Sequence, residues 1–175
     1  MWKKTFFSIV CIVAFCFIAT GCKSDPKPKT EKVEESGVGE LAVDATTYSL
    51  PYGYRVEADN YYRFIFSNLS QKNVKLTTKT RWTYCDVLLL DVKQGLLPGE
   101  YNAQVNVTVE QPIGGEDVQA PLVAIAQGTM KLSGTTNEYE FTFASKSIRI
   151  VNNDLSVFTP QNITLKYKGK LIEWE

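Results

Sequence analysis

The chain has 175 residues, 44% of them hydrophobic, with 19 basic and 19 acidic residues and no histidine. A protein that tracks nucleic-acid phosphates needs a clustered basic excess, and this balance suggests no such role, so we expect no nucleic-acid partner. The absence of histidine excludes Ser-His-Asp and Cys-His nucleophiles and histidine-based zinc or iron sites, so we expect no enzyme, no cofactor and no metal.

The first predicted element is a secretory signal over residues 1–21. Lys3 and Lys4 precede an apolar run over residues 5–19, which ends in small residues. A positive start, an apolar stretch and a small-residue cleavage site are typical of such a signal. A retained transmembrane anchor is the weaker interpretation, because a spanning helix normally needs about 20 apolar residues. We therefore expect an exported protein.

The signal ends at Ala19-Thr20-Gly21-Cys22, where two cleavage events remain open. Ordinary signal peptidase accepts a small-x-small site and would leave a soluble protein. The same four residues resemble a bacterial lipobox, although Ala19 stands where leucine is usual. This resemblance, which we prefer, implies that Cys22 carries acyl chains and becomes the mature N-terminus, so that a lipid anchor attaches the protein to a membrane.

The composition of residues 22–37 predicts a flexible linker between this anchor and the domain. They are mostly charged or small, with two prolines that disfavour regular structure. Lys23, not aspartate, follows the cysteine, and by resemblance to the sorting rule of diderm lipoproteins this implies the outer membrane. Whether the domain faces the periplasm or the cell exterior stays open.

Residues 38–175 are enough for one domain with one core. Cys11 and Cys16 belong to the signal and Cys22 to the lipobox, so Cys85 has no disulfide partner within the mature chain. It lies in a strongly apolar run, and we interpret it as a small buried residue. A reactive thiol is the alternative.

The domain shows alternation with period two almost throughout, and no segment shows helical spacing over ten residues. Ala103, Val105, Val107 and Val109 point one way while polar residues between them point the other. The same pattern predicts two further groups of inward side chains. One is Tyr139, Phe141 and Phe143, and the other is Ile163, Leu165 and Tyr167. Further strands are predicted near residues 40–49, 53–58, 61–68, 74–80, 81–92, 121–132 and 147–151.

Turn residues separate these strands. Leu97-Pro98-Gly99-Glu100 suits a type II turn, with positive φ at Gly99, and predicts the start of a hairpin. Residues 85–92 are apolar on both faces and predict a central strand. Nine or ten short strands predict an all-β fold, an antiparallel β-sandwich, with a lipocalin-like β-barrel as the alternative.

Four stretches carry a family resemblance: TTYSLPYGY at 46–54, LLPGEY at 96–101, AQGTMKLSGTTNEYEFTF at 126–143 and NITLKYKGKL at 162–171. Together they resemble the small β-rich lipoproteins that Bacteroidetes encode in large numbers. The resemblance implies an all-β lipoprotein and no catalytic residue.

Aromatic residues supply the candidate binding site. Tyr52, Tyr54 and Trp82 could form an exposed face that stacks on a glycan or anchors an envelope protein. The alternative is that these rings are structural and the protein is an envelope component without a small ligand. Glu138 and Glu140 share one strand face, but they alternate with inward rings, which assigns them to solvent and not to catalysis.

Overall fold

The computed structural model describes residues 33–56, 61–76, 80–90, 92, 95–113, 122–135, 137–151 and 159–174. The predicted signal, Cys22 and most of the linker lie outside these residues. The elements are β1 (Gly37–Val43), β2 (Thr46–Ser49), β3 (Tyr52–Val56), β4 (Tyr62–Ser67), α1 (Gln71–Leu76), β5 (Thr80–Leu89), β6 (Gly99–Ile113), β7 (Leu122–Thr135), β8 (Glu138–Val151), β9 (Asn162–Gly169) and β10 (Ile172–Glu173). The prediction of an all-β fold is confirmed. No helix in the described part of the chain is long and apolar enough to cross a membrane.

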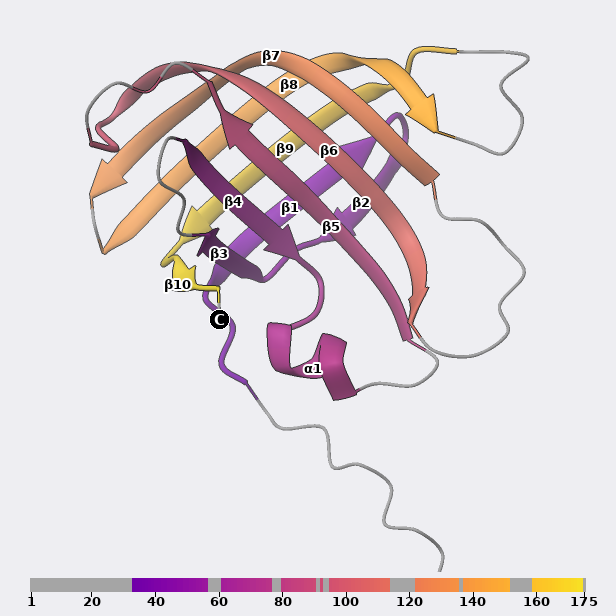
Figure 1. Ribbon diagram of the computed structural model, residues 1–175, viewed down its shortest axis with the longest axis horizontal. Helices are drawn as coiled ribbons and strands as arrows, with labels where there is room; N and C mark the ends of the chain where they lie inside the picture. Colours follow the sequence, from indigo (N-terminus) through magenta and orange to yellow (C-terminus); the bar gives the residue numbers. More distant parts are fainter. Residues whose placement is uncertain are drawn as a thin grey trace, which may run out of the picture.

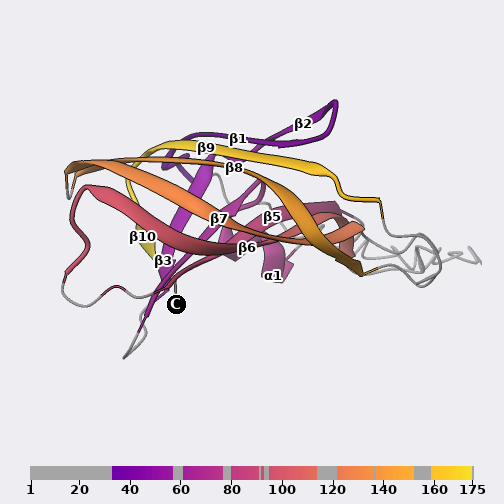
Figure 2. The ribbon, with the colours of Figure 1, turned by 90° about the horizontal axis from the view of Figure 1, so that it is seen from above.

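All ten strands belong to one strongly curled sheet, in the order β10-β3-β4-β5-β6-β7-β8-β9-β1-β2. Every pair is antiparallel except β10 with β3, which is parallel. Strands β4 to β6 form a front layer, with α1 beside them, and β7 to β9 and β1 arch behind it (Figures 1 and 2). The core therefore lies inside the curl of a single sheet, which forms a half-barrel and not two separate stacked sheets.

The curled sheet meets itself where β2 runs into β3. These two strands lie at or near opposite ends of the sheet order, yet only Leu50 and Pro51 separate them in the chain. The Leu50 amide donates to the Gly39 carbonyl at 2.9 Å, and the Ser36 and Gly37 amides donate to the Pro51 carbonyl at 3.0 and 3.1 Å. The first residues of the domain thus fasten the corner at which the two ends of the sheet come together.

The period-two pattern identifies the core correctly. Side chains on alternate positions of β6, β8 and β9 are buried, among them Val105, Val107, Phe141, Ile163 and Leu165, each 0% exposed. Phe141 packs against Phe64 and Phe66 of the front layer, with ring centroids 5.0 and 5.2 Å apart. These contacts between β8 and β4 join the two layers.

The predicted strand at 74–80 is wrong over residues 74–76, which belong to α1. Ser70 caps this helix, because its hydroxyl accepts a hydrogen bond from the Asn73 amide at 3.2 Å and its carbonyl accepts one from Val74 at 3.0 Å. A helix of six residues is too short to show helical periodicity, so the cap stabilises it locally where the pattern gives no signal.

The predicted turns also need correction at two places. Gly99 does not have positive φ; it is the first residue of β6 and pairs with Leu132. The hairpin of β5 and β6 exists, but the chain between Leu89 and Gly99 connects it, with positive φ at Gly95. The predicted strand 40–49 is two strands, because Asp44, at φ 50°, turns β1 back into β2.

Candidate functional site

The outer surface of β4 and β5 is the most unusual part of the described structure. Outward positions on β6 to β9 carry mainly asparagine, glutamine, threonine, lysine and glutamate, as expected for a sheet face in water. On β4, β5 and the residues beside them, the outward positions are instead largely apolar. We call this surface the β4–β5 face; it consists of Tyr61, Arg63, Trp82, Tyr84, Asp86, Leu88 and Leu90. Ile65 also lies on this side of β4, but it is only 7% exposed.

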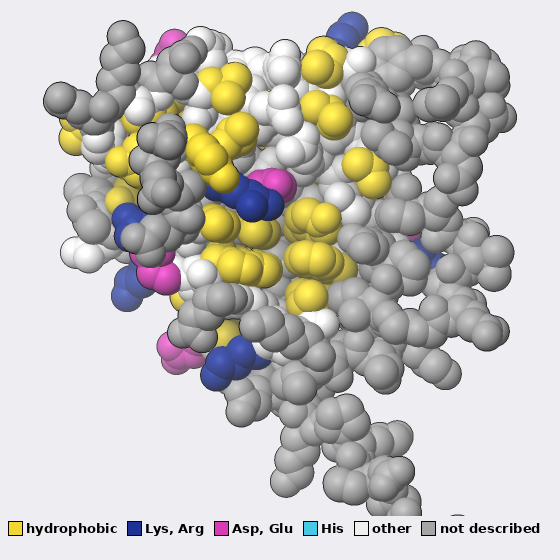
Figure 3. Space-filling model, in the orientation of Figure 1, with side chains coloured by type: hydrophobic (Ala, Val, Ile, Leu, Met, Phe, Trp, Pro, Cys, Tyr) yellow, Lys and Arg dark blue, Asp and Glu magenta, His cyan; other side chains and the backbone are white. Residues whose placement is uncertain are grey.

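The β4–β5 face combines exposed apolar groups with one ion pair. Tyr61 is 46% and Leu90 37% exposed at one end of the two strands. Within the face, the Arg63 guanidinium donates to both Asp86 carboxylate oxygens, at 2.8 and 2.9 Å. Figure 3 shows hydrophobic side chains gathered on the side of the molecule where β4, β5 and α1 lie, with basic and acidic groups among them.

Trp82 and Tyr84 form a stacked pair on this face, with ring centroids 4.0 Å apart and planes at 27°. Both rings are half-buried. The Trp82 indole N–H donates to the hydroxyl of the buried Ser67 at 2.8 Å, which fixes the orientation of the indole. Trp82 therefore lies partly open to solvent on β5, beside a second ring.

Tyr54 is not available to a ligand, and the expectation of an open ring there is wrong. Its side chain is 2% exposed, and its ring meets Trp174 edge-on with centroids 5.0 Å apart. Its hydroxyl accepts a hydrogen bond from the Gln71 amide, at the start of α1, at 2.8 Å. Strand β3 is also no edge, because β10 and β4 flank it.

Tyr52 is half-buried, and its hydroxyl donates to the Val33 carbonyl at 3.4 Å. It points toward the segment by which the chain enters the domain. Tyr52, Tyr54 and Trp82 thus do not form one exposed platform. The ion pair of Arg63 with Asp86 could not be predicted from the sequence, because the two residues are 23 positions apart and meet only through the pairing of β4 with β5.

The structure also places the two glutamates and the cysteine that could carry chemistry. Glu138 and Glu140 are exposed, as expected from their alternation with buried rings. Cys85 is fully buried on the inner face of β5, and this burial raises the pKa of its thiol far above the ordinary range. No group of three or more acidic or cysteine side chains that could hold a metal ion occurs within the described residues.

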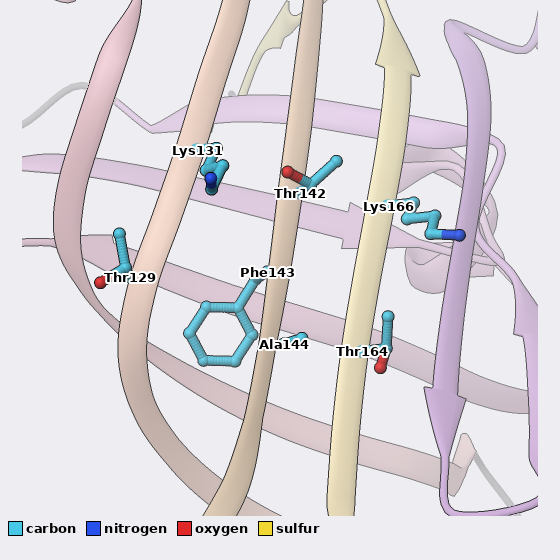
Figure 4. A pocket seen from close by; sticks show the side chains of 7 residues that line it. All are labelled: Thr129, Lys131, Thr142, Phe143, Ala144, Thr164 and Lys166. Atoms are coloured by element: carbon cyan, nitrogen blue, oxygen red, sulfur yellow. The ribbon is translucent and has the colours of Figure 1, made fainter.

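A second surface feature lies on the opposite layer, on the outer side of β7, β8 and β9. A shallow hollow of about 380 Å³ lies there, and Figure 4 shows the side chains that line it. Two lysines, three threonines and an alanine from three neighbouring strands line it, together with the buried Phe143: Thr129, Lys131, Thr142, Ala144, Thr164 and Lys166. The hollow could not be predicted from the sequence, because it depends on the register of three strands.

Comparison with protein-family models, with curated proteins and with solved structures finds no match for this chain. Its two surface features must therefore be interpreted from their own chemistry.

Proposed function

We propose that this chain is an outer-membrane lipoprotein, anchored by acyl chains on Cys22, and that it acts without catalysis as a binding module for another envelope protein. The signal, the lipobox-like residues and the charged linker support the anchor. The histidine-free composition and the solvent-exposed Glu138 and Glu140 support a role other than catalysis. The family resemblance to small Bacteroidetes lipoproteins agrees with both points.

The β4–β5 face is the observation that carries the proposal. A sheet that is apolar on both sides normally has something packed against each side. On the inner side this is the core; on the outer side, Tyr54 and Trp174 contact each other beside α1 but leave Tyr61 and Leu90 exposed. Contiguous apolar groups on a surface indicate an interaction site.

A protein partner fits this face better than a small molecule does. Tryptophan, tyrosine and arginine are the residues most enriched at the energetic centres of protein interfaces, and Trp82, Tyr84 and Arg63 lie here together. Leu88 and Leu90 add aliphatic surface that a sugar would leave unused. A glycan ligand is the second candidate, because the stacked Trp82–Tyr84 pair offers aromatic surface to a sugar ring.

Site-specific photo-crosslinking in living cells tests the proposal. A photoreactive amino acid at Tyr61 should yield a discrete protein adduct, and the same group at Lys146, which is exposed on the opposite layer, should not. Leu90→Lys should abolish the Tyr61 adduct while the fold, measured by circular dichroism, stays intact. Glycan binding that Trp82→Ala removes, without any adduct at Tyr61, would instead establish the glycan alternative.

A further inference from the structure

The hollow on the outer side of β7 to β9 has an ordered arrangement that follows from strand register. Lys131 pairs with Thr142, and Thr142 pairs with Lys166, so a lysine, a threonine and a lysine form one row across three strands. Neighbouring strands are about 4.8 Å apart, which places the two lysine backbones about 10 Å from each other. Figure 4 shows both lysines with Thr142 between them.

The hollow itself results from the short side chains in the next row. Ala144 lies two residues along β8 from Thr142 and pairs with Thr164 on β9. Thr129 lies two residues from Lys131 on β7 and also lines the hollow. Alanine and threonine between longer neighbours leave the depression, in which the methyl group of Ala144 is exposed.

The lining carries positive charge and hydroxyl groups but no carboxylate. The Lys131 amine forms an ion pair with the Glu100 carboxylate of β6, with Nζ and Oε1 3.0 Å apart. Both side chains are more than 60% exposed, so a ligand can compete with this ion pair at a small cost in free energy. Lys166 forms no ion pair within the described residues, although Glu40 of β1 lies opposite it in the register. A ligand in the hollow can therefore bring its own negative charge to Lys166.

We propose that this hollow binds a carboxylate-bearing sugar residue of an acidic polysaccharide. The two lysines would pair with the sugar carboxylate, the hydroxyls of Thr129, Thr142 and Thr164 would hydrogen-bond ring hydroxyls, and Ala144 would contact the apolar face of the ring. The volume lies within the usual range of about 300–1,000 Å³ for ligand pockets. The site is independent of the β4–β5 face, since the two lie on opposite layers of the sheet (Figures 1 and 4).

Calorimetric titration of the lipidated protein in detergent tests this site with four probes: tetragalacturonate, a tetrameric alginate, neutral galactotetraose and inorganic phosphate. At least one acidic tetramer should bind saturably, and galactotetraose and phosphate should bind at least about tenfold more weakly, because neither offers both the charge and the hydroxyl pattern.

Lys166→Gln should weaken binding of the acidic tetramer about tenfold, as expected for the loss of a charged hydrogen bond. Ala144→Gln, which fills the hollow at an exposed position without changing its charge, should have at least this effect.

Lys146→Gln is the matched control. Lys146 is exposed on β8, two residues beyond Ala144, and does not line the hollow, so its removal should change binding less than about twofold. The proposal is overturned if neither acidic tetramer binds saturably, or if phosphate or galactotetraose binds as tightly as they do. It is equally overturned if Lys146→Gln weakens binding as much as Lys166→Gln, since that would reveal general attraction to a basic surface.

Discussion

The ring of Tyr167 occupies the space that a side chain at Gly53 would need: a Cβ atom on Gly53 would lie 2.5 Å from Tyr167 Cζ. Added Cβ atoms at Gly37 and Gly39 would also lie under 3.0 Å from atoms of Tyr167. The Tyr167 hydroxyl donates to the Lys170 carbonyl at 2.8 Å and lies 2.9 Å from the Ser36 hydroxyl, which accepts from the Gly53 amide at 2.7 Å. This buried ring and its glycines hold the corner where β1, β3 and β9 meet.

Gly53→Ala is therefore expected to destabilise the domain by about 1–3 kcal/mol, because the Tyr167 ring is held by hydrogen bonds and cannot move aside freely. Gly99→Ala serves as the control. An added Cβ there would come no closer than 3.8 Å to its neighbours, and its φ is not positive, so we expect a change within about 0.5 kcal/mol. Denaturant unfolding measures both; equal effects would show that the Tyr167 corner tolerates a methyl group.

The strands could be predicted from the sequence because alternation is a local property. In β6 and β9, the alternation of apolar and polar residues alone predicts which side chains point into the core. These are the alternate residues from Ala103 to Val109 and from Ile163 to Tyr167. The corner around Tyr167 could not be predicted, because Ser36 and Gly53 lie far from Tyr167 in the chain. Helix α1 could not be predicted for a different reason, namely that a helix of six residues is too short to show periodicity.

The β4–β5 face, which we propose as a binding surface, could be predicted only in part. The aromatic composition pointed to Trp82, which does lie on the outer side of its strand beside Tyr84. Alternation also placed Tyr52 and Tyr54 together, but it cannot show that Trp174, at the other end of the chain, covers one of them. Burial of an outward side chain depends on what packs over the sheet, and this information lies outside the strand.

Tyr54→Ala is accordingly expected to act on stability and not on a ligand. The change removes a ring that is 2% exposed, its contact with Trp174 and its hydrogen bond to α1, so the free energy of unfolding should fall by about 3–5 kcal/mol. Tyr61→Ala, at 46% exposure, should cost within about 0.5 kcal/mol. A Tyr54→Ala protein as stable as wild type would show that the ring is not packed as described.

Because Cys85 is buried, we expect the free energy of unfolding of the domain to fall at alkaline pH. Burial raises the pKa of its thiol in the folded state, so the native protein keeps the proton that the unfolded chain releases above about pH 8.5. The stabilising effect is complete below that pH, and the free energy of unfolding should fall as the pH rises further, by at most about 1.4 kcal/mol per pH unit from this group.

Cys85→Ala tests this assignment, because it removes the titrating thiol whatever it costs in packing. Chemical unfolding between pH 8 and pH 10 should show a shallower decline for the variant than for the wild type. Burial also raises the pKa values of Tyr54 and Tyr167, so both proteins should lose further stability at still higher pH. Parallel curves for the two proteins, or rapid reaction of native Cys85 with a thiol reagent, would contradict a buried, protonated thiol.

The last prediction concerns Cys22, on which the proposed anchoring depends. If acyl chains on this cysteine hold the protein at the membrane, Cys22→Ala should abolish incorporation of radioactive palmitate and move the protein from the membrane to the soluble fraction, because two or more acyl chains are needed for stable attachment. Cys85→Ala is the matched control, since it also removes one thiol but should leave labelling and fractionation unchanged. Continued labelling of the Cys22→Ala protein would place the lipid elsewhere. A wild-type protein that is secreted without label would favour ordinary signal peptidase, and with it a soluble module in place of an anchored one.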